Sequence, residues 1–525
     1  MTSMRAEPAS APAAVIKQLV IDAQQDPLLP RPNPTQAFWQ LPPAPISQTR
    51  SAQLPARTTY AIIGSGVTGC SVAKNLLENL PADSKETVTM LEARTLTSGA
   101  TGRNGGHLLS PLPEEFLQVE KYLGRDETAK ISRFAVRTLE SMYALADEDE
   151  SLSKAAEARR VTTITGYYDR DTFEAAKESQ KRYEESLPEF KGDHRVYTAE
   201  DALKEFSMKD TVGVITNNAG AFWPYRLVTG LYSRMLKQYQ DRFSIETETP
   251  VTKIEYEPAE EAAYPYTVTT TRGSIRASKV IHCTNGWAGH LLPNLRGKIF
   301  PVRGTMSTQA AGPEFPHEGD KKSWATVGRP TYDSTDDTFS YGLYYITQNE
   351  KTGDLFIGGE KQKALELLTA NDTEVSTASK DTLVNILPKI FAKGWPSCQK
   401  PEIKSVWSGV LGFTPDHLPW VGRVPSSVSA RRGHDEYIAA GFNGYGMPLC
   451  WGSGEAVAKM ILGKQDEVRE RLPVSFEMTS KRLNSPYSTP EAGILNLIGQ
   501  EPDWTTTARL SVQSMVGTAY SMLFG

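Results

Sequence analysis

Residues 58–80 read TTYAIIGSGVTGCSVAKNLLENL, which joins a short apolar run, a glycine-rich turn and a periodic apolar segment. The run Thr58–Ile63 is rich in β-branched and apolar residues, which is typical of a buried strand. Apolar residues after the turn recur at helical spacing, at Val67, Val72, Leu76 and Leu80. The stretch therefore predicts a strand, a tight loop and a helix in direct succession.

The loop within this stretch has the spacing G-x-G-x-x-G, at Gly64, Gly66 and Gly69. In such a loop the first glycine makes the turn, the second lets a pyrophosphate approach the backbone, and the third lets the helix pack on the strand. The helix N-terminus then offers free N–H groups to the anion. Glu92 ends a second predicted strand, 23 residues after Gly69. An acid that binds ribose hydroxyls is expected about 20 residues beyond the last glycine. The pattern predicts a bound FAD or NAD.

A second glycine-rich stretch, GATGRNGGH at residues 99–107, follows the strand that ends at Glu92. It has little apolar surface to bury, and its four glycines disfavour a helix. A flavin needs such a loop, because backbone N–H groups must reach the ring edge without intervening side chains. A nicotinamide needs none there, and no second G-x-G-x-x-G follows a predicted strand. The stretch favours FAD, and a mobile surface loop is the alternative.

The composition is that of an ordinary globular protein and excludes several functions. The 525 residues carry a formal net charge of −5, which gives no field that attracts nucleic acid or a membrane surface. Neither the seven histidines nor the four cysteines show metal-site spacing, so we expect no metal and no disulfide framework. The cysteines are Cys70, Cys283, Cys398 and Cys450. Without a secretion signal or a long apolar run, a cytoplasmic protein is expected.

The order of the predicted elements indicates an α/β fold made of two interleaved domains. Strand-type runs, glycine turns and helices predict a discontinuous Rossmann-type FAD-binding domain with a parallel sheet, over residues 57–115, 211–299 and 401–470. Residues 116–210 and 300–400 predict a substrate domain with helices and a mixed or antiparallel sheet. The turn NEKTGD between two β-type runs of the second segment suggests a hairpin.

Three further features concern the two ends of the chain and one predicted helix. Residues 1–56 form a proline-rich N-terminal arm, and its aromatic pair Phe38–Trp39 is expected to dock on the protein. Residues 471–525 form a C-terminal extension without an assigned role. Inside the helical segment, Asp171 is expected to cap a helix, with Glu174 completing a capping box.

Several segments together resemble the FAD-dependent oxidases of the D-amino-acid oxidase, glycine oxidase and sarcosine oxidase type. They are IIGSGVTG, LEARTLTSGATGRNGGH, CTNGW, PVRG, the W-x-G…TPD…P-x-x-G segment and AAGFNGYGM. The resemblance covers roughly residues 58–470, and the GRNGG motif is most similar to that of the branch that oxidises γ-glutamylputrescine and related amines. The resemblance implies FAD, two-electron oxidation of a C–N bond and, often, hydrogen peroxide.

The resemblance also implies which residues bind the cofactor. The positions are Gly64, Ser65, Gly66, Val67, Thr68, Gly69, Glu92, Ala93, Arg94, Ala100, Thr101, Arg103, Asn104, Gly105, Gly106, His107, Val251, Thr284, Gly286, Asn443, Gly444, Tyr445, Gly446 and Met447. Ser65 to Gly69 would meet the pyrophosphate, Glu92 the adenosine ribose, and the backbone of Val251 the adenine. The helix expected after Met447 would stabilise negative charge at the flavin's pyrimidine end.

Departures from the family pattern shape the expected chemistry. Gly409 stands where some members carry a flavin-linking cysteine, so we expect noncovalent FAD. Leu411 stands where glycine oxidases carry an arginine for a carboxylate, which favours an amine substrate over a simple amino acid. Phe356 replaces a lysine that assists oxygen, which leaves oxygen use open. Leu411, Phe356 and Tyr344 are expected at the substrate pocket.

The expected reaction is hydride transfer from the carbon beside a neutral amine to flavin N5, with O2 as acceptor and H2O2 as product. Alignment and exclusion of water can suffice for such chemistry. Candidate catalytic residues are therefore only His107, Tyr345 and Arg303, each with a packing or turn-supporting role as the alternative. The rival functions are a dehydrogenase or biosynthetic tailoring enzyme with another acceptor, a non-catalytic flavin-binding assembly protein, and a nicotinamide dehydrogenase. The oligomeric state is not predicted.

Overall fold

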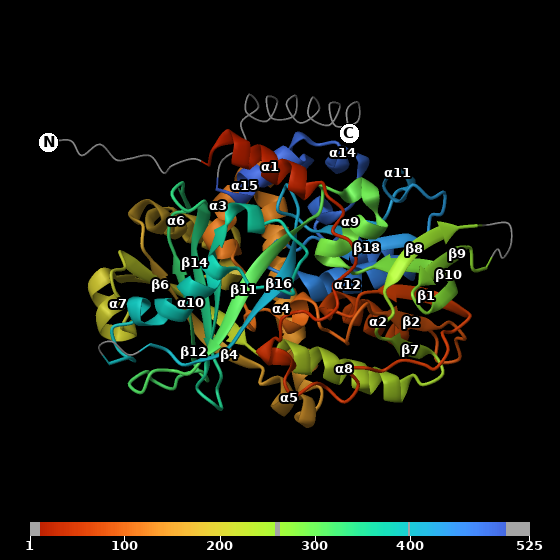
Figure 1. The fold of residues 1–525 in the computed structure, drawn as a ribbon, viewed down its shortest axis with the longest axis horizontal. Coiled ribbons are helices and arrows are strands. Elements are labelled where there is room, and N and C mark those ends of the chain that lie inside the picture. The colour runs from red at the N-terminus through yellow and green to blue at the C-terminus, as the bar shows by residue number, and fades with distance from the viewer. Residues whose placement is uncertain (1–10, 258–262, 397–399, 500–525) are drawn as a thin grey trace.

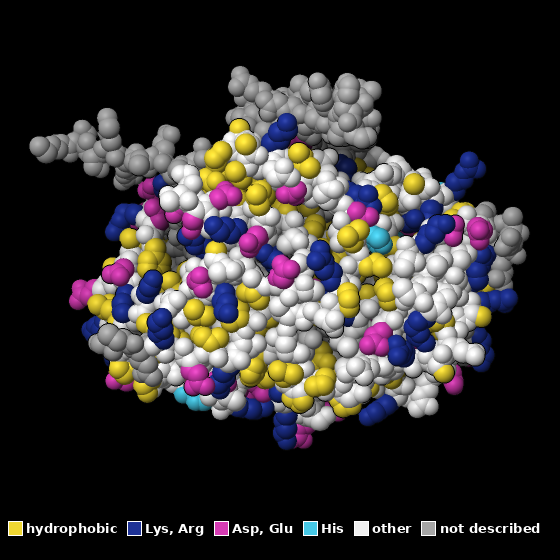
Figure 2. Space-filling view, viewed as in Figure 1, with side chains coloured by type: hydrophobic (Ala, Val, Ile, Leu, Met, Phe, Trp, Pro, Cys, Tyr) yellow, Lys and Arg dark blue, Asp and Glu magenta, His cyan; other side chains and the backbone are white. Residues whose placement is uncertain are grey.

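The computed structural model describes residues 11–257, 263–396 and 400–499. Its strands form two sheets that lie side by side, with helices packed between and around them (Figure 1). Cys398 and residues 500–525 of the expected C-terminal extension lie outside the described residues. Over the face drawn in Figure 2, side chains of both charges are interspersed. None of the described helices is long and apolar enough to span a membrane.

The first sheet, sheet A, is built on the predicted strand–turn–helix unit and has the strand order β17-β18-β10-β1-β2-β7, with β9 pairing β10 and β8 pairing β9. Its strands are β1 (Arg57–Ile63), β2 (Val88–Leu91), β7 (Phe243–Glu246), β8 (Val251–Tyr256), β9 (Tyr266–Thr270), β10 (Gly273–His282), β17 (Trp420–Arg423) and β18 (Glu436–Ala440). The pairs β18–β10, β10–β1, β1–β2 and β2–β7 are parallel. The prediction of a parallel sheet is confirmed.

The two faces of sheet A bury different clusters because side chains alternate along a strand. Tyr60 and Ile62 face a core that includes helices α2 (Val67–Asn79), α4 (Arg125–Asp147), α8 (Pro224–Gln238) and α12 (Met447–Ile461). Ala61 and Ile63 face the opposite cluster, formed with β8, β9 and β10. Helix α8 begins at Pro224, as the sequence predicts, because a proline at the first position of a helix loses no internal hydrogen bond.

The second sheet, sheet B, has the strand order β16-β11-β15-β14-β12-β4-β6-β3, with β13 and β5 at its sides. Its strands are β3 (His107–Leu108), β4 (Arg159–Tyr167), β5 (His194–Thr198), β6 (Gly213–Ala221), β11 (Phe300–Gln309), β12 (Lys322–Val327), β13 (Thr331–Asp333), β14 (Thr338–Gln348), β15 (Leu355–Lys363) and β16 (Ile403–Phe413). Only the β12–β4 pair among these is parallel. The expected mixed sheet is confirmed, and the predicted hairpin joins β14 to β15 with Gln348 opposite Leu355.

Three strands lie in a different sheet from the one their sequence position suggests. β3, β6 and β16 fall within the segments assigned above to the FAD-binding domain, but all three pair in sheet B. The chain returns to sheet A through α8 and again after β16 ends at Phe413, in both cases about ten residues later than the predicted boundary. A strand belongs to the sheet that satisfies its backbone hydrogen bonds.

The helical segment consists of α3 (Leu112–Leu123), α4, α5 (Glu150–Ala156), α6 (Arg170–Ser186) and α7 (Ala199–Phe206). Asp169, not Asp171, caps α6, since its carboxylate accepts a hydrogen bond from the Thr172 N–H at 2.9 Å. Asp171 lies inside the first turn instead. The cap was therefore predicted two residues too late, and the predicted capping box of Asp171 with Glu174 is wrong.

The N-terminal arm is ordered over its described part and crosses both sheets. It begins with α1 (Ala13–Ala23), which packs against α15 (Pro490–Leu497) near the end of the described chain (Figure 1). The arm then reaches η1 (Phe38–Gln40), where the expected docking occurs: the Trp39 ring stacks on Phe356 with 3.9 Å between ring centroids. Helix α10 (Thr377–Ile390) covers the far face of sheet B.

Candidate active site

A large cavity lies between the loops that follow the strands of sheet A and one face of sheet B. Its volume is about 2220 Å³. Pockets for a single drug-sized ligand measure about 300–1,000 Å³, so this cavity has room for a large cofactor and a second molecule.

Most of the predicted cofactor residues, although far apart in the sequence, line this one cavity. They are Gly64, Ser65, Gly66, Val67, Thr68, Glu92, Ala93, Arg94, Ala100, Thr101, Arg103, Asn104, Gly105, His107, Val251, Thr284, Asn443, Gly444, Tyr445, Gly446 and Met447. The other three do not line it: Gly69, Gly106 and Gly286 pack behind the wall. At Gly286, a Cβ would lie 2.7 Å from the Leu411 carbonyl oxygen.

The turn between β1 and α2 has the conformation that its glycines predict. Gly64 has φ +104°, and a Cβ there would lie 2.5 Å from the Cys283 carbonyl oxygen. A Cβ at Gly69 would overlap the Gly64 carbonyl group, so this glycine allows the helix to pack on the turn. Helix α2 starts after Gly66 without a side-chain cap. The Val67 N–H of its first turn donates to the Thr101 hydroxyl at 2.9 Å, and the N–H groups that follow are left for an anion at the cavity, which suits a pyrophosphate.

Glu92 stands at the end of β2 and holds the neighbouring turn. One of its carboxylate oxygens accepts hydrogen bonds from the Ser65 N–H at 3.0 Å and the Ser65 hydroxyl at 2.6 Å. The other oxygen accepts from the Arg94 N–H at 3.0 Å. A carboxylate has about four acceptor sites, so capacity remains for the ribose hydroxyls that the sequence predicts there.

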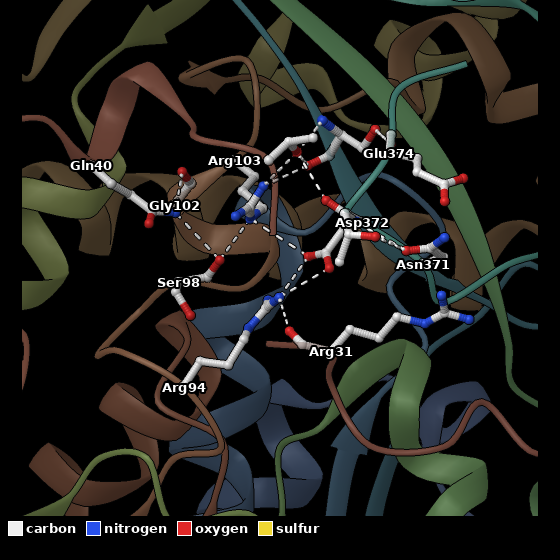
Figure 3. Close-up of polar contacts among 12 residues, drawn as sticks. Arg31, Gln40, Arg94, Ser98, Gly102, Arg103, Asn371, Asp372 and Glu374 are labelled. Atoms are coloured by element: carbon white, nitrogen blue, oxygen red, sulfur yellow. Dashed lines mark hydrogen bonds and ion pairs between the residues drawn. The ribbon is translucent and has the colours of Figure 1, made fainter. Parts of the chain in front are cut away.

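The side chains of Arg94 and Arg103 are held by protein groups. The Arg94 guanidinium binds Asp372, and the Arg103 guanidinium donates to the carbonyl oxygens of Ser98, at 2.8 Å, and Ser408, at 2.7 Å. Figure 3 shows both guanidinium groups turned toward Asp372. Burial and the charge of Arg94 lower the pKa of Arg103 to about 10, against the opposing effect of Asp372. Both arginines thus fix the loop that lines the cavity.

The loop at residues 104–106 is wedged between the N-terminal arm and sheet B. A Cβ at Gly105 would lie 2.7 Å from the Tyr345 ring, and the Gly105 carbonyl oxygen accepts a hydrogen bond from Thr347 at 2.8 Å. Trp39 lies on the other side, where its indole N–H donates to the Asn104 carbonyl oxygen. A residue larger than glycine does not fit here, which is the physical reason for the GRNGG run.

A second helix also begins at the cavity. Helix α12 starts at Met447 after Gly446, again without a side-chain cap. Asn443, at φ +52°, fixes the preceding turn because its side-chain oxygen accepts the Thr414 N–H at 2.7 Å. Cys450 is buried inside α12 as expected, and burial raises its pKa to about 12.

One face of sheet B forms the opposite wall, and strand alternation decides which side chains reach it. The contributing positions are Val161, Thr163, Thr165 and Tyr167 of β4, Ala325 and Val327 of β12, and Tyr341, Leu343 and Tyr345 of β14. Tyr345 and Leu411 therefore line the cavity. Tyr344 faces the other way and packs with Ile346 against α10, and Phe356 lies behind the wall on Trp39. Tyr344 and Phe356 are thus not at the pocket where the sequence was expected to put them.

The other candidate catalytic residues, His107 and Arg303, also line the cavity. The Nε2 atom of His107 is buried and has no hydrogen-bond partner within the described chain. Burial and the charge of Arg159 lower the pKa of His107 to about 4, so its imidazole is neutral near pH 7. Arg303 is bound to Glu366, with 3.0 Å between Nη2 and the carboxylate.

Sequence reasoning missed two carboxylates, Glu114 and Glu115, in the first turn of α3. Both line the cavity. Burial and the neighbouring Glu114 charge raise the pKa of Glu115 to about 7, and burial raises that of Glu114. Acids in a first turn are common because they complement the helix dipole, so the pattern alone carried no functional signal.

One cavity is lined by two helix N-termini, an acid placed to bind a ribose and a glycine loop. This combination is typical of a dinucleotide-binding oxidoreductase. Residues 59–460 match the family model described as "FAD dependent oxidoreductase" (DAO), and the chain belongs to this FAD-dependent family. Among curated relatives, "Probable oxidoreductase OrdL" of Rhizobium meliloti is 23% identical over 82% of this chain and 91% of its own length. "Gamma-glutamylputrescine oxidoreductase" of Escherichia coli is 22% identical over 77% of this chain and 83% of its own.

Solved structures show the same fold. L-proline dehydrogenase from P. horikoshii has a TM-score of 0.57 at 18% identity, covering 86% of this chain and 100% of its own. Glycine oxidase from Geobacillus kaustophilus has a TM-score of 0.56 at 18% identity, covering 83% of this chain and 99% of its own. The predicted family and fold class are confirmed.

Proposed function

We propose that the protein oxidises the C–N bond of an amine, with noncovalent FAD as cofactor and O2 as final acceptor. The amine loses a hydride and a proton to become an imine, and O2 takes up both electrons and two protons to become H2O2. The observation that carries the proposal is the convergence of residues 64–68, 103–107 and 443–447 on one cavity of a FAD-dependent family member.

FAD, when bound, supplies the acceptor for the hydride. The chain's own groups for holding it are the uncapped first turns of α2 and α12, Glu92 and the loop at residues 104–106. The start of α12 would stabilise negative charge on the reduced cofactor, as a helix N-terminus does. Gly409 lines the cavity and has no side chain that could form a covalent link, which supports noncovalent binding.

An amine is favoured over a simple amino acid by the chemistry of the cavity wall. Recognition of a carboxylate calls for a free arginine fork, but the expected position holds Leu411, whose side chain is apolar. The nearby Arg303 already binds Glu366. A gamma-glutamylputrescine oxidoreductase among the relatives, whose name describes an amine-containing substrate, supports the same class.

The wall formed by sheet B would align the substrate and exclude water, because Ala325, Val327 and Leu343 present apolar side chains to the cavity. His107 is the titratable group best suited to keep the reacting amine neutral. Its Nε2 atom is buried without a partner, and the imidazole is uncharged near pH 7. An amine must be neutral before its carbon can release a hydride, and an uncharged imidazole, unlike a carboxylate, does not stabilise the ammonium form.

The test uses the purified holoprotein without oxygen. Amines and amino acids are added in turn while the flavin absorbance near 450 nm is followed, and air is then admitted with a peroxide assay. Bleaching by amines, followed by rapid recovery with stoichiometric H2O2, is expected. A colourless protein, or one that no amine bleaches, contradicts the proposal, and bleaching by amino acids alone contradicts the amine class.

A dehydrogenase with an electron acceptor other than O2 is the second candidate function. Phe356 stands where related oxidases place a lysine, and its ring faces Trp39 instead of the cavity. In that case amines bleach the flavin but air restores the colour slowly. Recovery with an artificial quinone would then identify a dehydrogenase.

A further inference from the structure

We propose that Glu114 and Glu115 form a cation subsite that binds a second, non-reacting ammonium group of the substrate. This rests on the proposed amine oxidation and narrows its substrate class to diamines and to amines with a distal cationic nitrogen. The two carboxylates lie in the first turn of α3, on the wall of the same cavity.

The carboxylates have no counter-charge of their own. Glu114 accepts a hydrogen bond from the Asn217 amide at 3.1 Å, and Glu115 accepts one from the Tyr445 hydroxyl at 3.5 Å. Both donors are neutral. Within residues 11–257, 263–396 and 400–499, no lysine, arginine or histidine is ion-paired with either glutamate, and no cation contributes to their pKa values. Carboxylates on a cavity wall without a counter-charge are unfavourable, so the site favours an incoming cation.

A third polar group, the Tyr167 hydroxyl, lies beside this pair. Tyr167 is only 1% exposed and lines the cavity from β4. Burial, and after it the charge of Glu114 and a hydrogen bond to Glu114, raise the pKa of the phenol. The side-chain oxygen of Asn217 is buried and has no hydrogen-bond partner among the described residues. Four oxygen-bearing side chains from α3, β4 and β6 thus surround the same part of the cavity.

An ammonium group matches this set of acceptors. It carries three donors, enough for both carboxylates and one of the two neutral oxygens. The pair suits a nitrogen that stays charged, because two carboxylates would hold the proton that a reacting amine must lose. Tyr445 ties the subsite to the turn before α12, so the subsite belongs to the same site as the proposed flavin position. A chain with two nitrogens could then occupy both parts of the cavity.

The test compares α,ω-diaminoalkanes with monoalkylamines of the same chain length on the holoenzyme. The variants are Glu114→Gln and Glu115→Gln, which keep the side-chain shape and remove the charge. Glu120→Gln is the matched control on the same helix, because Glu120 pairs with Arg182 and does not line the cavity. Recovery of the flavin spectrum shows that each variant is folded.

We expect the wild-type kcat/KM for the best diamine to exceed that for the monoamine of the same length by at least about 10-fold. This is the effect expected of one charge-assisted hydrogen bond. E114Q and E115Q should reduce this ratio to near 1 by raising the diamine KM more than the monoamine KM, and E120Q should leave the ratio intact. An unchanged ratio in both cavity variants, or an equal loss in E120Q, overturns the subsite.

Failure of the subsite and failure of amine oxidation give different results. Diamine binding is also measured without turnover, as a shift of the flavin absorbance spectrum in the oxidised holoenzyme. If diamines bind in the wild type and not in E114Q or E115Q, but never bleach the flavin, the subsite stands and the oxidation is wrong. If monoamines and diamines bleach the flavin equally in every variant, the oxidation stands and the subsite is wrong. If diamines neither bind nor react, both are wrong.

Discussion

One guanidinium nitrogen of Arg94 donates to both carboxylate oxygens of Asp372, at 3.0 and 2.9 Å, and both residues are buried. The Nε atom of Arg103 lies 3.8 Å from the same carboxylate. The backbone carbonyl of Asp372 accepts hydrogen bonds from the N–H and hydroxyl of Thr35 in the N-terminal arm. Asp372 therefore joins three segments, the arm, the loop after β2 and the chain after β15, at one point beneath the cavity wall (Figure 3).

Replacing Asp372 with asparagine should leave two buried guanidinium groups without their counter-charge. Removing one partner of a buried pair costs about 3–5 kcal/mol, so we expect the free energy of unfolding in urea to fall by that amount. Flavin content after dialysis should fall as well, since Arg94 and Arg103 fix the loop. The control is Asp466→Asn, at an exposed pair with Arg469, with an expected change below about 0.5 kcal/mol. Equal effects of the two substitutions would contradict this role.

Trp39 should hold the loop at residues 104–106 through both its ring and its indole N–H. Trp39→Ala removes the stack on Phe356 and the bond to Asn104, and large-to-small substitution of such a residue costs about 3–5 kcal/mol. Trp39→Phe keeps an aromatic ring and loses the hydrogen bond, at about 1 kcal/mol. The measurements are urea unfolding and the Kd for FAD after reconstitution. A W39A protein with wild-type affinity for FAD would show that the arm does not support the loop.

Gly105→Ala should weaken FAD binding because the added methyl group would lie 2.7 Å from the Tyr345 ring. Overpacking of this kind costs about 1–3 kcal/mol and displaces the loop. The cause is checked with a double-mutant cycle: the alanine should cost less in a Tyr345→Ala background, where the ring is gone. Additive effects of the two substitutions on the Kd for FAD would assign the loss to backbone flexibility instead.

The stability of the protein should depend on pH through Glu115, whose pKa is raised from 4.5 to about 7. Between pH 4.5 and 7 the folded state keeps a proton that the unfolded chain releases, so lowering the pH within this range favours the folded state. This contribution is complete below about pH 4.5 and is lost as the pH rises through 7. Glu115→Gln should therefore flatten the decline of unfolding free energy between pH 5 and 7, and E120Q should not. Parallel profiles for wild type and E115Q would contradict the raised pKa.

The sequence predicted those parts of the fold that depend on neighbouring residues. Gly64, Gly66 and Gly69 determine a turn whose steric demands are local, so β1, α2 and β2 could be placed. The β14–β15 hairpin followed from its turn residues in the same way. Gly105 was expected to let the backbone approach a flavin, which stays a prediction; within the protein itself, the group close to Gly105 is the Tyr345 ring.

What could not be predicted depends on contacts between distant segments. Alternation implied that Tyr344 and Tyr345 face opposite ways, but only the position of α10 decides which one reaches the cavity. Asp372 has no motif around it and gains its role through Arg94, far away in the sequence. Glu114 and Glu115 resemble ordinary first-turn acids until the fold places them on the cavity wall beside β4 and β6. Similarly, Asp169 and Asp171 are equally good caps in sequence, and the start of α6 selects the first.

The N-terminal arm also implies an order of assembly. Leu28, Leu29 and Pro30 form part of the cavity wall, yet Thr35 is anchored by Asp372, which is synthesised 337 residues later. This segment must therefore wait for the synthesis of most of the chain that follows it before it can settle, and until then the cavity wall is incomplete on that side.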